Sequence, residues 1–186
     1  MIHESFPWKQ DLHRRKRLIK KYNTKEQFEK NSDAAYTVIE KGIFYSAFII
    51  RKLADCKTKL SDKADKYTLQ VRAIKPLIHI NALNRWPDEE SHDWDNETLL
   101  TIQGKDICNW LIHSYIFFTE KDDNSSAPVG SFYVSSDYDR NKYLYRISIG
   151  DWLNYMEFIA TDYIVAMGSR YDETKSDYIC MYKTRG

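Results

Sequence analysis

The sequence predicts an α+β protein that is mainly a helical bundle, with a long central helix and a C-terminal β-hairpin plus helix. Glycine and proline are scarce, with 6 and 4 copies in 186 residues, which disfavours a chain built from many tight turns. The segment from Lys25 to Lys57 contains no proline and a single glycine. Two segments typical of strands, 131–135 and 143–149, flank a turn-like connection.

The chain length is typical of one domain, and we expect residues 1–186 to form a single unit. Within it the sequence predicts a basic N-terminal helical segment (1–22), a helical core (23–120), and a hairpin with the C-terminal helix (121–186).

The long helix is predicted from its apolar periodicity. Thr24 precedes Gln27 in the spacing of a capping box, so the helix should begin there. Apolar and small residues that include Ile39, Gly42 and Ile50 share one face, while Phe44 lies on the opposite side. A helix that is apolar on two sides is usually central in a bundle.

The other elements are predicted from local patterns. Ser61 has the chemistry of an N-cap, and residues 67–80 are compatible with either a strand or a helix. The remaining segments are expected to be helices at 11–22, 106–118 and 151–165, short strands at 98–102 and 178–182, and loops at 81–96 and 168–177.

Several classes of protein are disfavoured. The three cysteines are far apart in the sequence and have no metal-ligand spacing, so neither a disulfide framework nor a zinc site is expected. No glycine-rich phosphate loop is present, and we predict no cofactor and no metal. The longest apolar run, 42–50, is too short to span a membrane, and no signal peptide is evident. We therefore expect a cytoplasmic protein without a membrane partner.

The charges are unevenly distributed although the net charge is only +1. Residues 9–21 carry seven Lys and Arg against one acid, and residues 88–97 carry six acids and no base. These segments can be ordinary solvated surfaces, or the basic one can contact nucleic acid. The candidate nucleic-acid-binding residues are Arg14, Arg15, Arg17, Lys20 and Lys21.

A second candidate site lies in the predicted helix 106–118, where Asp106, Asn109 and His113 share one face. A histidine in this position can act as a general acid or base near neutral pH. Alternatively, His113 is structural and buried in a closed hydrogen-bond network.

The segment Asn109-x-x-Ile112-His113-Ser114-Tyr115 resembles the Arg-Asn-x-x-Ile-His-Gly-Tyr segment of many HEPN domains. These domains are helical bundles of toxin–antitoxin and phage-defence systems. Many are metal-independent ribonucleases that pair two protomers, so the resemblance implies RNA as a partner and a homodimer. Cys108 occupies the position of the catalytic arginine, and Ser114 occupies that of the glycine.

The cysteine bears on activity because a ribonuclease without a metal needs a cation near the scissile phosphate. Either the domain is inactive or another residue supplies the charge, for which Arg51 is the candidate. Arg51 can instead form a surface ion pair with Asp55. The leading hypothesis is a non-catalytic RNA-binding or regulatory module of a bacterial or phage conflict system. The alternatives are a protein-interaction subunit and an active ribonuclease that uses His113, Asn109 and Arg51.

Overall fold

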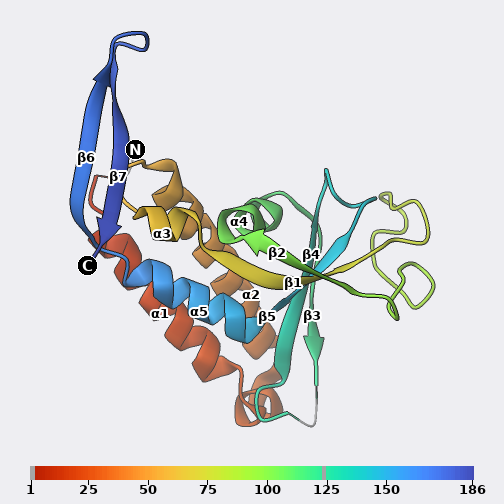
Figure 1. Ribbon diagram of the computed structural model, residues 1–186. Helices are drawn as coiled ribbons and strands as arrows, with labels where there is room; N and C mark the ends of the chain where they lie inside the picture. Colours follow the sequence, from red (N-terminus) through yellow and green to blue (C-terminus); the bar gives the residue numbers. More distant parts are fainter. Residues whose placement is uncertain (1–2, 123–124) are drawn as a thin grey trace.

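A five-stranded antiparallel sheet forms the centre of the protein (Figure 1). The structure, a computed structural model, describes residues 3–122 and 125–186. The strand order is β2-β1-β5-β4-β3. The strands are β1 (Thr68–Ile74), β2 (Thr98–Gln103), β3 (Ser114–Lys121), β4 (Val129–Ser136) and β5 (Leu144–Ser148). The prediction of a mainly helical bundle is therefore wrong, although the α+β class itself holds.

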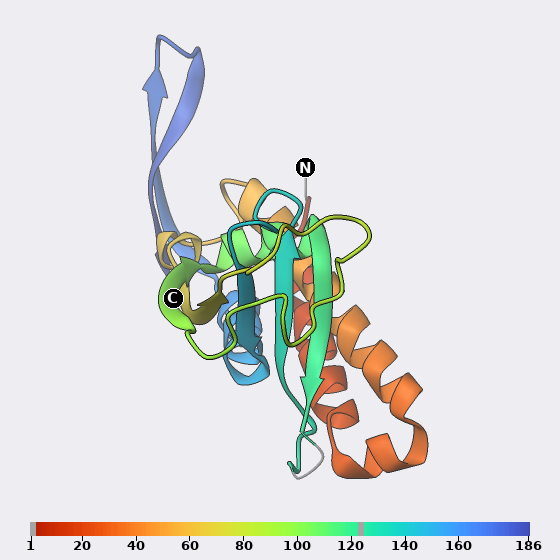
Figure 2. The same cartoon turned by 90° about the vertical axis from the view of Figure 1, so that its right-hand side faces the viewer.

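Helices cover one face of this sheet (Figure 2). They are α1 (Phe6–Tyr22), α2 (Lys25–Asp55), the single turn α3 (Asp62–Asp65), α4 (Gly104–Ile112) and α5 (Ile149–Ala160). The main core lies between these helices and the sheet. Trp152 on α5 is fully buried there, and its indole N–H donates to Ser46 Oγ of α2 at 3.0 Å.

The alternation of side chains along β4 explains the two layers. Phe132 and Val134 join the core on the helical side, whereas Tyr133 belongs to a smaller cluster on the other face. The loop at residues 75–97 crosses that second face (Figure 2) and contributes Ile80 and Trp94 to the smaller cluster. The acidic segment 88–97 therefore lies in a loop on the face opposite the helices.

The long helix is present but does not occupy the centre of a bundle. Thr24 caps it as predicted, accepting from the N–H of Gln27, and a non-helical residue interrupts it at Asn31. Phe44 packs on Phe117 of β3 with ring centroids 4.6 Å apart, so its side of the helix faces the sheet. Phe48 is 44% exposed. The side of α2 that carries Phe44 and Phe48 therefore packs partly on the sheet and lies partly at the molecular surface.

A two-stranded hairpin extends from the rest of the molecule (Figure 1). Its strands are β6 (Ile164–Asp172) and β7 (Asp177–Arg185), and we call residues 164–185 the arm. The predicted strand at 178–182 is confirmed within β7. The predictions of a helix to residue 165 and a polar loop at 168–177 are wrong, because α5 ends at Ala160 and β6 begins four residues later.

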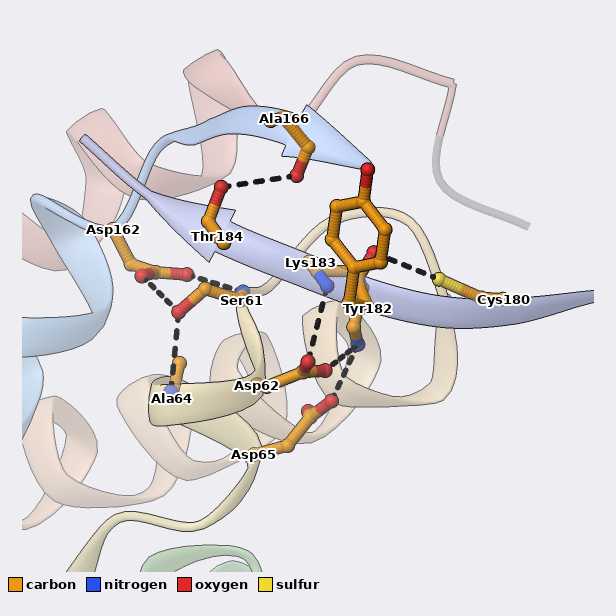
Figure 3. A network of polar contacts seen from close by, with 10 residues as sticks. All are labelled: Ser61, Asp62, Ala64, Asp65, Asp162, Ala166, Cys180, Tyr182, Lys183 and Thr184. Atoms are coloured by element: carbon orange, nitrogen blue, oxygen red, sulfur yellow. Dashed lines mark hydrogen bonds and ion pairs between the residues drawn. The ribbon is translucent and has the colours of Figure 1, made fainter. Parts of the chain in front are cut away.

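A network of ionic and polar contacts holds the base of the arm (Figure 3). The buried carboxylate of Asp162 accepts from the N–H of Ser61 at 2.7 Å and from its hydroxyl at 2.6 Å. Ser61 is also the N-cap of α3, as predicted. Lys183 of β7 donates its backbone N–H to Asp62 at 3.0 Å and its ammonium to Asp65 at 2.5 Å. The arm is thus tied to α3 through both backbone and side chain.

Candidate nucleic-acid interface

Helix α1 has a buried side and a basic side. Pro7 lies in its first turn, where the absence of an N–H costs no hydrogen bond. Leu12 and Ile19 are fully buried and fix the orientation of the helix against its neighbours. Their spacing leaves the opposite side of the helix to charged residues.

Arg14, Arg17 and Lys20 line up on this basic side. They follow one another at intervals of three residues, which places them along one side of the helix over about 9 Å. All three are exposed, and within the described part of the chain none of them has an ion-pair partner. Their charges are therefore available to a ligand.

These three residues open onto a hollow of about 820 Å³ beside α5, which we call the basic groove. Its lining consists of Pro7, Gln10, Asp11, His13, Arg14, Lys16, Arg17, Lys20 and Glu157. Neither acid in the lining is unpaired. Glu157 binds Lys16 at 3.1 Å and His13 at 3.3 Å, and Asp11 lies 3.5 Å from Arg15 Nε.

Glu157 is ionised in this environment. Partial burial acts to raise the pKa of its carboxyl, but the hydrogen bond and charge of Lys16, together with His13, outweigh burial and hold that pKa below its usual value. The groove consequently keeps an excess of positive charge near neutral pH.

Two of the five predicted basic residues lie outside the groove lining. Arg15 turns toward α2, with its guanidinium 4.7 Å from the centre of the Tyr45 ring. Lys21 lies 5.9 Å from the Tyr22 ring. The structure brings Arg14, Arg17 and Lys20 together in one groove and separates Arg15 and Lys21 from them.

Sequence reasoning missed His13, Lys16 and Glu157 as groove residues. His13 precedes Arg17 by four positions and Lys20 by seven, so helical periodicity could have placed it on the same side. Glu157 gives no such signal, because it lies 141 positions from Lys16 in the sequence and reaches it only through the packing of α5 on α1.

The second candidate site is assembled only in part. Arg51 donates from Nε to the side-chain oxygen of Asn109 at 2.7 Å, and it also forms an ion pair with Asp55. His113 is exposed, so the expectation of a histidine buried in a closed network is wrong. It is the C-cap of α4, and its backbone N–H donates to the carbonyl of Asn109. The predicted helix 106–118 therefore ends at Ile112, and the residues after His113 form β3.

His113 and Asn109 open onto a shared hollow of about 430 Å³, lined also by Trp110, Ser136, Asp137, Tyr138 and Asp139. Arg51 is not part of this lining. The charged groups that face the histidine are thus two carboxylates, each paired with a neighbouring cation of its own loop. Among the described residues that line it, this hollow offers a general base but no cation for a phosphate.

Cys108 cannot take part at this surface because its side chain is fully buried. Burial raises the pKa of its thiol far above the usual value, so the thiol stays protonated. An arginine in this position would enter the core and would not be displayed beside His113.

Among the residues that the structure describes, no group of three or more His, Cys, Asp and Glu side chains is placed to hold a metal ion. Within residues 3–122 and 125–186, no helix combines the length and apolar character needed to cross a bilayer.

The fold and the groove together define an α+β protein that carries a basic helical surface. Comparison of the chain with protein-family models, with curated proteins and with solved structures gave no match. The function of this chain is therefore inferred from its own geometry.

Proposed function

We propose that the protein is a non-catalytic RNA-binding module whose basic groove on α1 contacts the phosphate backbone. One observation carries this proposal: Arg14, Arg17 and Lys20 are exposed in a row along a groove, with no carboxylate paired to them in the described chain. Rows of unpaired cations bind polyanions because each contact releases a condensed counterion.

The composition of the groove indicates how RNA would be bound. None of the described residues that line it is Phe, Tyr or Trp, and His13 carries the one aromatic ring among them, so it offers little surface on which successive bases could stack. Its donors are guanidinium and ammonium groups, which suit phosphate oxygens. We therefore expect binding that depends strongly on salt and weakly on RNA sequence.

The choice of a non-catalytic module follows from the second site. Cleavage of RNA without a metal needs a cation beside the general base. Cys108 is buried, Arg51 is paired with Asp55, and the hollow at His113 is lined by Asp137 and Asp139. This arrangement favours binding over the ribonuclease alternative.

The biological setting is proposed on the resemblance alone. The HEPN-like segment 108–115 supports a regulatory role in a bacterial or phage conflict system, and with it a cytoplasmic location. The bundle architecture of HEPN domains lends no further support, because a five-stranded sheet occupies the centre of this fold.

The test is a charge reversal with a matched control. Fluorescence anisotropy with a labelled RNA would compare the wild type with Arg14→Glu/Arg17→Glu/Lys20→Glu. The control is Lys66→Glu/Lys75→Glu/Lys105→Glu, which changes the net charge equally at exposed lysines outside α1. We expect the groove variant to lose at least about 100-fold in affinity and the control to lose far less. Equal losses would contradict the proposal, and so would an absence of binding by the wild type.

A further inference from the structure

The arm exposes an unusual amount of apolar surface. Six large apolar side chains of the arm, together with Tyr163 immediately before it, are 45% or more exposed; the six are Val165, Met167, Tyr171, Tyr178, Met181 and Tyr182. A two-stranded ribbon is marginally stable in water unless something packs against it. Exposed apolar side chains concentrated on one element are typical of an interface.

The arm is nevertheless held in a fixed position. Asp162 at its base is fully buried and bonded to Ser61, and Lys183 is bonded to Asp62 and Asp65 (Figure 3). On the other side of the base, Lys9 of α1 donates its ammonium to the backbone carbonyl of Asp162. A surface held in this way loses little conformational entropy when it binds.

The arm is better suited to contacts through its side chains than to pairing of its edges with another strand. Val165 and Met181 have no cross-strand partner in the register of β6 and β7, so each is the extra residue of a β-bulge. Bulges twist an edge away from pairing with another strand. On β7 the backbone N–H of Lys183 is already occupied by Asp62. We therefore expect side-chain packing against the arm, without addition of another strand.

The molecule also carries an apolar groove that its own arm does not fill. Two hollows of about 730 Å³ and 360 Å³ lie between α1 and α2 and share Trp8 and Phe48 in their lining. These two rings are 6.4 Å apart between centroids. Tyr45 and Phe48 are 49% and 44% exposed. We call this surface the aromatic groove.

The charges around the aromatic groove and at the tip of the arm are opposite. The lining of the groove includes three lysines, Lys52, Lys57 and Lys59, against two aspartates. Asp55 is paired with Arg51, and Asp11 lies 3.5 Å from Arg15 Nε. The tip of the arm, residues 172–177, carries three acids, Asp172, Glu173 and Asp177, against one lysine, Lys175. An apolar arm with an acidic tip thus complements an apolar groove with a basic rim.

The positions of the arm and the aromatic groove allow two copies of the chain to exchange their arms. The lining of the aromatic groove includes His3, Trp8 and Lys59, and the adjacent Lys9 contacts the base of the arm. The groove therefore opens near the base of the arm, whereas the acidic tip lies about 30 Å away along nine-residue strands. When two arms lie antiparallel, each tip reaches the base of its partner.

We propose that two copies of this chain form a two-fold symmetric dimer in which the arm of each copy packs in the aromatic groove of the other. The exchange is isologous and closed, so the assembly stops at two chains. This inference is independent of RNA binding, because the basic groove and the aromatic groove have different linings apart from Pro7 and Asp11 at their junction.

Sedimentation-velocity ultracentrifugation of the full chain, from about 1 to about 100 µM, tests the proposal. The wild type should be dimeric at the upper concentrations. Tyr178→Ser/Met181→Ser should raise the dissociation constant by about 100-fold, because two apolar side chains leave the interface. A monomeric wild type over the whole range would overturn the proposal.

A charge swap distinguishes this interface from any other. Lys52→Glu/Lys57→Glu at the rim and Glu173→Lys/Asp177→Lys at the tip should each raise the dissociation constant at least about tenfold. The chain that carries all four substitutions should regain dimerisation to within about threefold of the wild type, because each reversed tip meets a reversed rim. The matched control Lys66→Glu/Lys75→Glu should leave the constant unchanged. Unchanged dissociation constants in both charge-reversal variants would refute the arrangement. Failure of the chain with all four substitutions to regain dimerisation would refute it as well.

Discussion

Gly42 of α2 lies against α1, and the substitution Gly42→Ala probes that contact. A methyl group on Gly42 would lie 2.6 Å from Ile19 Cγ1 and 2.9 Å from Ile19 Cδ1. Optimal carbon–carbon separations are about 3.5–4.0 Å. Ile19 is fully buried, so it cannot relieve this contact by moving out into solvent.

The expected cost can be worked out against a second glycine. Overpacking of this kind costs about 1–3 kcal/mol, while alanine gains roughly 1 kcal/mol over glycine inside a helix. Gly150 is an exposed helical glycine of α5 whose added methyl would lie 3.4 Å from Ser148 Oγ. Gly150 is in the first turn of α5, so subtracting the effect of Gly150→Ala removes part of the propensity gain. The unfolding free energy of Gly42→Ala should therefore be about 1–3 kcal/mol lower than that of Gly150→Ala.

Urea denaturation followed by circular dichroism measures both variants. The double variant Ile19→Ala/Gly42→Ala provides the decisive comparison, because the new methyl then occupies space that Ile19 vacates. We expect it to be at least about 1 kcal/mol more stable than the sum of the two single effects. Additive effects, or equal stabilities of the two glycine variants, would refute the close packing of α1 on α2 at this position.

Three further predictions concern buried polar groups. Ser46→Ala should lower the unfolding free energy by about 1–3 kcal/mol in urea denaturation, because the buried indole N–H of Trp152 loses its acceptor. The thiol of Cys108 should react with a thiol reagent at pH 8 only after denaturation, because it is buried and its pKa is raised; labelling in the native state, located by mass spectrometry, would contradict this. Burial lowers the pKa of His92 below its usual 6.5, so its neutral form is favoured in the folded state, and denaturation midpoints should fall as the pH drops from about 6.5 toward the lowered pKa. The non-titrating His92→Asn should flatten that decline, and an unchanged pH dependence in this variant would show that His92 does not cause it.

Local capping chemistry predicted where several elements begin. Thr24 and Ser61 are confirmed as N-caps, since each side-chain oxygen accepts from a backbone N–H three residues later. The two strands expected at 131–135 and 143–149 are confirmed as β4 and β5, which pair antiparallel. These features depend on residues close together in sequence, so local patterns suffice to find them.

Strand β3 shows why the architecture was missed. The run 106–118 is apolar enough to read as one helix, and short apolar runs do not distinguish a buried helix from a strand. What makes Ser114–Lys121 a strand is its pairing with β4, for example Phe117 opposite Val134. That pairing joins residues of two consecutive strands, 17 positions apart in this example, which periodicity within one segment does not reveal.

Only some residues of the basic groove could be found from the sequence, for a similar reason. The three-residue spacing of Arg14, Arg17 and Lys20 is visible in the sequence, and the structure places all three in the groove. Arg15 does not lie on this surface because its guanidinium is over the ring of Tyr45 of α2, and the sequence does not place these two residues near each other. The sequence could predict that these basic residues lie on one helix. The direction of each side chain, however, depends on tertiary packing.

The salt dependence of RNA binding tests the central claim most directly. The logarithm of the association constant should fall linearly with the logarithm of salt concentration, and each phosphate contact contributes about 0.7–0.9 to the slope. Loss of the contacts by Arg14, Arg17 and Lys20 should make the slope of the triple glutamate variant shallower by about 2–3 than that of the wild type. Identical slopes for the two proteins would show that the basic groove does not hold the RNA backbone.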